Sequence, residues 1–375
     1  MQRCSRRSFL AASAVGGMAA TAGCLGGSVR GGQDGDGTTT TETTTGSPSE
    51  SATASDGEPP LADAALTVQY PFERLRSGVV SGGPPKDGIP SIDEPTFTDA
   101  SAANDRLDDG DVVFGVVRGS DAKAYPQNVL VWHEICNDTL DGTPVSVTYC
   151  PLTGTAMGFD RGATTFGVSG DLLNDNLVMY DRATDSRWPQ MLATAIEGQF
   201  AERSLREFRL VWTTWGRWRD AHPDTRVLSE ETGYVRDYDD DPYGSYNPRD
   251  GYYAGGDPLF PPLRTDDRLD GKAVVVGTRS SEGAAAFPKD ALRTEKLLDG
   301  ELAGTPLLAA YDPDLDTAYV YRNPDERSFA FRDGDVVGPD GTPSAPADLP
   351  LERQYAYDGM WFAWAGLYPE TSVHE

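Results

Sequence analysis

One short region combines a histidine, an acidic residue and two cysteines that could support metal or thiol chemistry. His133-Glu134 precedes Cys136, and Cys150 follows in a Tyr-Cys-Pro segment. Thiolate sulfur and imidazole nitrogen are ligands that copper and zinc favour, so Cys150, His133 and Cys136 could bind either metal. Alternatively, His133 beside Glu134 could lower the pKa of the Cys150 thiol and create a nucleophile, which predicts Cys150, His133 and Glu134 as catalytic residues.

A disulfide between Cys136 and Cys150 is the structural alternative. It would form in an oxidising compartment outside the cytoplasm. Closing a loop of about 15 residues would stabilise the fold by about 3 kcal/mol. Two inert buried cysteines and a hydrogen-bonded core histidine also agree with the sequence, so these alternatives stay open.

A second group of polar side chains lies between apolar segments in residues 169–190. Such a density of polar groups predicts either the wall of a ligand cleft or a set of loop caps around a buried Trp188. The candidate ligand-binding residues are Ser169, Asn174, Asp181, Ser186 and Gln190.

An internal repeat relates residues 112–156 to residues 274–318 at a constant offset of 162, with 15 identities in 45 positions. The identities are mostly Gly, Pro and apolar residues, which fix turns and cores. The second copy has other residues where chemistry is expected, because Glu295, Leu298 and Asp312 replace His133, Cys136 and Cys150. The candidate site therefore belongs to the first copy alone.

The repeat and the strand patterns predict a β-rich α+β fold of two tandem related halves packed together. Val-rich and alternating runs predict strands at 111–117, 144–149, 155–159, 164–168 and 177–180, and in the second half at 272–278, 306–311, 317–321 and 328–331. We expect helices at 127–137, 212–220 and 290–299. Residues 233–268 are rich in Tyr, Pro, Gly and Asp and predict a long ordered loop.

The N-terminus has the features of an export signal. Arg6-Arg7 precedes an apolar stretch, Leu10–Ala22, which is shorter than the roughly 20 residues that a membrane-spanning helix needs. Paired arginines at this place are typical of twin-arginine export. The following Gly23-Cys24 resembles a lipobox, so we expect a signal peptide at 1–23 and a lipid on Cys24. The protein would then sit on the extracellular face of the cell membrane.

Composition narrows the partners of the folded part. The chain has 59 acidic and 32 basic residues and a net charge of −27. Such a charge repels nucleic acid, so we expect no nucleic-acid partner and a membrane contact only through the lipid anchor. A Thr/Ser/Gly-rich tether at 24–60 cannot form a core. We expect the first half at 61–270 and the second, degenerate half at 271–375.

With these residues in view, the chain resembles the domain-of-unknown-function 3179 family. The resemblance covers roughly residues 105–372 and rests on the motifs His133-Glu134-Ile135, Tyr149-Cys150-Pro151-Leu152, Phe166–Gly170, Leu177–Asp181, Thr184–Gln190, His222–Thr225 and Trp361–Trp364. Many members carry a second cysteine where Thr153 stands here and an aliphatic residue at Cys136. The resemblance implies no activity, and the acid-rich, lysine-poor composition adds the expectation of a twin-arginine lipoprotein from a halophilic archaeon.

Two functions remain as expectations. The first is a surface-anchored extracytoplasmic lipoprotein with a copper, zinc or thiol-redox site in its first half, centred on Cys150 and His133. The second is a non-catalytic surface binding module with a structural Cys136–Cys150 disulfide. In that module, loop 233–268 and the polar stretch 169–190 would form the ligand cleft.

Overall fold

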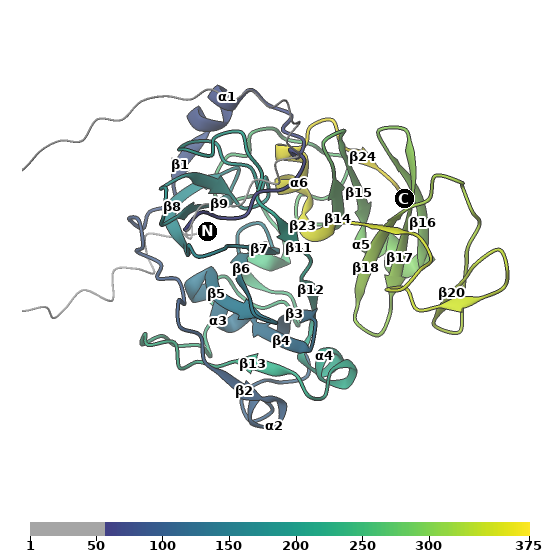
Figure 1. Ribbon diagram of the computed structural model, residues 1–375, viewed down its shortest axis with the longest axis horizontal. Helices are drawn as coiled ribbons and strands as arrows, with labels where there is room; N and C mark the ends of the chain where they lie inside the picture. The colour runs from purple at the N-terminus through teal and green to yellow at the C-terminus, as the bar shows by residue number, and fades with distance from the viewer. Residues whose placement is uncertain (1–56) are drawn as a thin grey trace, which may run out of the picture.

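A computed structural model describes residues 57–375 of the chain. It confirms a β-rich α+β fold, with several small sheets and six short α-helices in the described part (Figure 1). The predicted signal peptide, Cys24 and residues 25–56 of the predicted tether lie outside the described residues. Residues 57–60 belong to the folded part, because Pro59 is buried and the Pro60 carbonyl accepts a hydrogen bond from the Arg206 backbone.

The first unit contains two sheets that enclose a core. Their strand orders are β12-β3-β4-β13-β2 and β11-β7-β6-β5. The strands are β2 (Phe97–Asp99), β3 (Val112–Arg118), β4 (Asp121–Pro126), β5 (Ile135–Leu140), β6 (Thr143–Cys150), β7 (Thr155–Asp160), β11 (Glu207–Phe208), β12 (Val211–Thr214) and β13 (Arg226–Leu228). Helices α2 (Ala100–Ala103), α3 (Gln127–His133) and α4 (Trp215–Ala221) accompany them.

The second unit is built from sheets of order β23-β14-β15-β24 and β16-β17-β18-β22. Its strands are β14 (Val274–Arg279), β15 (Ala284–Pro288), β16 (Leu297–Leu302), β17 (Thr305–Asp312), β18 (Thr317–Arg322), β22 (Glu352–Gln354), β23 (Ala356–Met360) and β24 (Ser372–Val373), with helices α5 (Lys289–Glu295) and α6 (Trp361–Leu367). Helices α3 and α5 start 162 residues apart, and so do β5 and β16, β6 and β17, and β7 and β18.

In each unit a tryptophan lies against a glycine of an inner strand, β3 in the first unit and β14 in the second. A Cβ added at Gly115 would come within 2.2 Å of the Trp218 ring, and one added at Gly277 within 2.2 Å of the Trp364 ring. Each indole N–H donates to a threonine, at 2.9 Å from Trp218 to Thr225 and 3.0 Å from Trp364 to Thr371. A side chain on either glycine would leave no room for the indole, so this packing requires glycine.

The largest hydrophobic core joins the two units. It contains the outer face of β6 and β7, the hairpin of β8 (Phe166–Leu173) and β9 (Asn176–Asp181), and helix α6, in which every residue is buried. Figure 1 shows α6, in yellow, between the strands of the first unit and those of the second. The hairpin belongs to a further sheet, β1-β8-β9-β10, with β1 (Val79–Ser81) and β10 (Arg187–Pro189). The units therefore share one core.

The remaining elements are peripheral. They are α1 (Phe72–Ser77), a 3-10 turn at Gly251–Ala254, and a three-stranded sheet of β19 (Ala330–Arg332), β20 (Asp335–Val337) and β21 (Pro343–Ser344). Within residues 57–375, no helix has both the length and the apolar character needed to cross a membrane.

The three predicted helices are shorter than expected. The first ends at His133 because Glu134 has a positive φ of 58°, after which Ile135 begins a strand paired with β6. The helix expected at 290–299 ends in the same way, since Lys296 has a φ of 69°. The helix expected at 212–220 begins only at Trp215, because residues 211–214 pair with β3.

Candidate functional site

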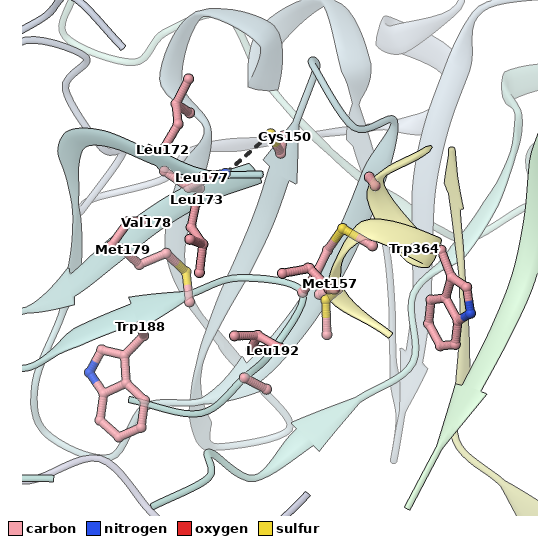
Figure 2. Packing of buried hydrophobic residues seen from close by; sticks show 14 of the residues in the cluster. Cys150, Met157, Leu172, Leu173, Leu177, Val178, Met179, Trp188, Leu192 and Trp364 are labelled. Carbon is pink, nitrogen blue, oxygen red and sulfur yellow. Dashed lines mark hydrogen bonds between the residues drawn. The ribbon is translucent and has the colours of Figure 1, made fainter. Parts of the chain in front are cut away.

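Cys150 lies at the end of β6 with its side chain in the joint core and is only 1% exposed. Its sulfur accepts a hydrogen bond from the Leu177 backbone N–H at 3.4 Å and lies 3.6 Å from the Asp175 carbonyl oxygen. Figure 2 shows the thiol next to Leu172, Leu173 and Leu177. The sulfur thus contacts the turn between β8 and β9 in an apolar environment.

Cys136 lies on the opposite face of the same sheet. It is paired with Val147 in the β5–β6 ladder and packs with Val147 and Tyr149 in the core of the first unit. Because side chains alternate along a strand, Cys150, three positions after Val147, must face the other way. No disulfide joins the two cysteines, so the expected Cys136–Cys150 bond is wrong. Burial raises the pKa of the Cys136 thiol well above its usual range, which keeps it protonated.

His133, the last residue of α3, is fully buried and uses both ring nitrogens within the fold. Nδ1 lies 2.8 Å from the Pro90 carbonyl oxygen and Nε2 lies 2.7 Å from the Tyr238 hydroxyl. A carbonyl can only accept, so Nδ1 donates to Pro90 and Nε2 accepts from Tyr238. Burial lowers the pKa of His133 to about 4, so the ring is neutral near pH 7.

Glu134 forms the left-handed end of α3 and connects the helix to β6. Its backbone N–H donates to the Leu130 carbonyl at 2.7 Å, and its carbonyl accepts from the Tyr149 N–H at 2.8 Å. Lys296 makes the matching backbone bonds in the second unit, to Leu292 and from Tyr311. The backbone geometry at Glu134 is therefore a property of the scaffold and not of the chemistry expected there.

The predicted metal ligands Cys150, His133 and Cys136 do not converge on one point. The two cysteines face opposite sides of a sheet, and both imidazole nitrogens of His133 have protein partners. Within residues 57–375, no group of three or more His, Cys, Asp and Glu side chains is arranged to hold a metal ion. The expected catalytic pair of Cys150 and His133 is not formed either. The His133 imidazole bonds Pro90 and Tyr238, whereas the Cys150 sulfur bonds the β8–β9 turn.

Asn174 and Gln190, two of the five predicted ligand-binding residues, are buried and hydrogen bonded inside the protein. Asn174 donates to the Ala363 carbonyl at 2.9 Å and accepts from the Leu263 N–H at 2.8 Å, which links the β8–β9 turn to α6 and to loop 233–268. Gln190 accepts from the Asn176 amide at 2.9 Å and donates to Thr148 at 2.8 Å. Both residues therefore organise the interior.

The other three predicted ligand-binding residues close local turns. Asp181 accepts from the Trp188 indole N–H at 3.0 Å, and from the backbone and hydroxyl of Thr184. Ser186 accepts from the Phe200 N–H at 3.2 Å. Ser169 donates to the Val178 carbonyl at 2.5 Å across the β8–β9 hairpin. In the structure, the polar stretch 169–190 is used for loop caps and strand links.

A cleft of about 350 Å³ lies where the two units meet, away from the cysteines. Loop 233–268 forms one side of the cleft, and β12 of the first unit forms another. Helix α5 and the ends of β14 and β23 contribute the side from the second unit. The lining residues are Val112, Gly154, Trp212, Thr213, Thr214, Tyr246, Asn247, Pro248, Arg249, Val274, Lys289, Arg293, Asp316, Asp358 and Met360. Sequence reasoning anticipated the loop but missed the residues from the second unit.

Four of the five charged residues that line the cleft are paired with each other, and the fifth, Arg249, is exposed and forms no ion pair among residues 57–375. Lys289 and Asp358 form an ion pair at 2.6 Å in which both side chains are 4% exposed. Arg293 holds Asp316 with two hydrogen bonds, of 2.8 and 2.7 Å. Burial favours the protonated form of Asp316, but the hydrogen bonds from Arg293 and the charge of Lys289 outweigh it and lower its pKa to about 2. Asp316 is thus a carboxylate and no proton donor near pH 7.

Tyrosines hold loop 233–268 against the first unit next to the cleft. Tyr246 stacks on Tyr253 with ring centroids 3.9 Å apart, and its hydroxyl lies 3.1 Å from that of Tyr149. Asp241 accepts hydrogen bonds from Gln127 at 2.7 Å and from Tyr253 at 3.1 Å. Gln127 occupies in α3 the position that Lys289 occupies in α5. Of the five lysines of the chain, Lys289 alone lines the cleft.

We predict that Cys136 and Cys150 are protected thiols in the folded protein. Without reductant, iodoacetamide should leave both unmodified under native conditions and alkylate both in denaturant, as read by peptide mass spectrometry. If the two cysteines resist alkylation in denaturant and react only after a reductant is added, they form a disulfide instead. Rapid alkylation of the native protein would contradict the burial.

A pH dependence of stability should follow from His133. Its folded pKa, about 4, lies below the unfolded value of 6.5, so the unfolded chain takes up the proton first. Stability from this group is complete above about pH 6.5 and is lost as the pH falls towards 4, by up to about 3 kcal/mol. The free energy of unfolding of His133→Gln should fall less steeply than that of the wild type between pH 7 and 4.5. Equal slopes would contradict the assignment.

Comparison with known proteins identifies the family. The model of the family described as "Protein of unknown function (DUF3179)" matches residues 86–371, a range that covers both units and the joint core. No curated protein and no solved structure matches the chain. Because the family model spans well over half of the sequence, the chain belongs to the DUF3179 family.

Proposed function

We propose that the protein is a lipid-anchored surface module that binds a small polar molecule in the cleft between its two units. The main support for this proposal is the set of residues that line the cleft. Its volume of about 350 Å³ also lies within the roughly 300–1,000 Å³ typical of ligand sites. Two ion pairs on one wall face residues of loop 233–268 and β12. This arrangement supports binding.

The paired charges on the second-unit wall favour a ligand without net charge, and exposed Arg249 on loop 233–268 adds one cation that has no ion-pair partner among the described residues. Lys289 and Arg293 are each matched by a carboxylate, so a charged ligand would have to displace a partner that is already bonded. Trp212 and Tyr246 add aromatic surface, and Met360 adds a flexible apolar contact. A saccharide of one or two rings, or a zwitterion, presents both polar edges and apolar faces, and so suits these walls.

Three considerations favour binding over thiol or metal chemistry. Cys150 is enclosed in the joint core, His133 is neutral with both nitrogens bonded, and Cys136 faces another core. The buried thiol does not line the cleft. A copper, zinc or redox site centred on Cys150 would need these contacts to be rearranged.

The anchoring part of the proposal rests on the N-terminal sequence. Arg6-Arg7, the apolar stretch Leu10–Ala22 and Cys24 together form the pattern of a twin-arginine lipoprotein signal. A Thr/Ser/Gly-rich tether after Cys24 would hold the folded part away from the membrane. The acid-rich composition supports an origin in a halophilic archaeon and argues against nucleic acid as a partner.

We further propose that the two units are copies of one ancestral unit. The offset of 162 residues in the sequence is matched by the starts of α3 and α5 and of three pairs of strands. The tryptophan-on-glycine packing and its threonine acceptor also recur in both units. The helix-starting residue of the second copy, Lys289, lines the cleft, whereas its counterpart Gln127 bonds Asp241 of loop 233–268.

The binding function can be tested by filling the cleft. Val274 lines it from β14, so Val274→Phe should block it while leaving every charged group in place. Ligand-observed NMR with a panel of mono- and disaccharides and zwitterionic amino acids should detect at least one ligand of the wild type. Its binding should weaken at least tenfold in Val274→Phe.

The matched control is Val337→Phe, because Val337 is also partly exposed on a strand but lies in the peripheral sheet β19-β20-β21. This variant should bind like the wild type. Failure of the whole panel to bind the wild type, or undiminished binding by Val274→Phe, would refute the proposed cleft function.

The anchor is tested separately by Cys24→Ser. Loss of the thiol that carries the lipid should release the protein from the membrane fraction or leave its signal uncleaved, whereas Cys4→Ser should remain membrane-bound. Cell fractionation with mass analysis of the N-terminus distinguishes these results. Normal processing and normal membrane retention of Cys24→Ser would reject the lipoprotein assignment.

A further inference from the structure

A second groove, of about 380 Å³, has an unusual charge for this protein. It lies between the end of β3, the β11–β12 segment and the β22–β23 segment, so both units contribute to it. Its lining residues are Val116, Val117, Arg118, Phe208, Arg209, Arg353, Gln354 and Tyr355. Three arginines and no carboxylate line this groove, in a chain where acidic residues outnumber basic ones by 59 to 32.

Arg209 is the central cation of this arginine groove. Its guanidinium donates to the Ala356 carbonyl at 2.6 Å and to the Thr317 hydroxyl at 2.7 Å, and it lies 5.0 Å from the centre of the Tyr319 ring. These partners are neutral, and among residues 57–375 no carboxylate lies within 4.0 Å of it. Nearby Arg279, by contrast, is paired with Glu207 at 2.8 Å. The charge of Arg209 therefore remains uncompensated.

Arg118 and Arg353 flank this cation. Arg118 bonds Asp160 at 2.7 Å, but the Arg353 guanidinium lies 4.0 Å from Asp348, and its side chain is 46% exposed. At that distance and exposure, an ion pair contributes little and leaves the guanidinium available. The groove thus combines one uncompensated cation with a second that is weakly held.

Two polar atoms of the groove residues also lack a bonding partner among the described residues. These are Arg209 Nε and the Tyr355 hydroxyl, both buried. Burial raises the pKa of Tyr355 well above its usual range, so the hydroxyl remains a donor. Buried donors are nearly always satisfied in folded proteins, so two unsatisfied donors on residues that line one groove are unusual.

We infer that the arginine groove binds a small organic anion with two or more oxyanion groups, carboxylate or phosphate. Arginine is suited to such groups because its planar guanidinium presents paired N–H donors to two oxygens. One uncompensated arginine and a second that is weakly held favour a ligand with more than one negative group. The aromatic rings of Phe208 and Tyr355 provide apolar surface for the carbon skeleton, and the volume exceeds what a single inorganic ion requires. This site is distinct from the cleft lined by Lys289 and Asp358.

Isothermal titration calorimetry with citrate and with pyrophosphate, at an ionic strength kept constant with NaCl, tests the inference on the full folded protein. At least one of the two should bind the wild type, and the difference between them identifies carboxylate or phosphate as the preferred group. Arg209→Gln and Arg353→Gln should each weaken binding at least tenfold. Arg332→Gln, which removes an exposed arginine of the peripheral sheet, should leave it unchanged.

Arg209 also bonds β18 and β23 of the second unit, so its replacement could prevent folding. In that case the anion affinity of Arg353→Gln alone tests the inference. Binding of neither anion by the wild type would overturn the inference, and so would wild-type affinity in Arg353→Gln. Val274→Phe should still bind the anion, so a failure of the cleft proposal remains distinguishable from a failure here.

Discussion

The rest of the structure depends on the burial of helix α6 in a core that both units share. All seven of its residues are buried, and the Tyr357 and Tyr368 hydroxyls on either side of it donate to the Met191 carbonyl of the first unit, at 3.1 and 2.9 Å. Apolar surface of this extent cannot be exposed without a large free-energy cost, so the second unit is not an independent domain. The orientation of the two units is thereby fixed, and both grooves at their junction are rigidly formed.

Cations are scarce in this chain, and the junction uses several of them. Lys289 and Arg293 are neutralised within the cleft, Arg279 is neutralised by buried Glu207, and Arg209 bonds only neutral groups. A buried pair is a weak source of stability, because desolvation offsets the attraction, but removal of one partner is costly. The Glu207–Arg279 pair and the hydrogen bonds from Arg209 to Ala356 and Thr317 cross between the units and help to specify how they fit together. Arg209, bonded only to neutral groups, also leaves an attraction for an external anion.

The sequence was informative about strands and turns and poor at placing side chains around a site. The Val-rich and alternating runs correctly indicated the strands that they cover, such as β3, β6, β7, β14, β17 and β18, because apolar residues in these patterns determine strands locally. Strands β4 and β15 were among those missed, since their Ala-rich sequences lack a strand signal. Strands β5 and β16 were also missed, because the helices predicted at 127–137 and 290–299 extended into them and nothing local marks the positive φ of Glu134 and Lys296. Alternation along β5 and β6 could have excluded the Cys136–Cys150 bond. The cleft could not be found this way, because it forms between units distant in sequence.

The buried Glu207–Arg279 pair has a consequence for how the protein responds to dilution of salt. Repulsion among the many surface carboxylates extends further as ionic strength falls, since the screening length grows from about 3 Å at 1 M to about 10 Å at 0.1 M. The Glu207–Arg279 pair, with side chains 10% and 0% exposed, hardly senses this change. Lowering the salt concentration should therefore destabilise the acidic surface regions first, and the interface between the two units should be the last part to unfold.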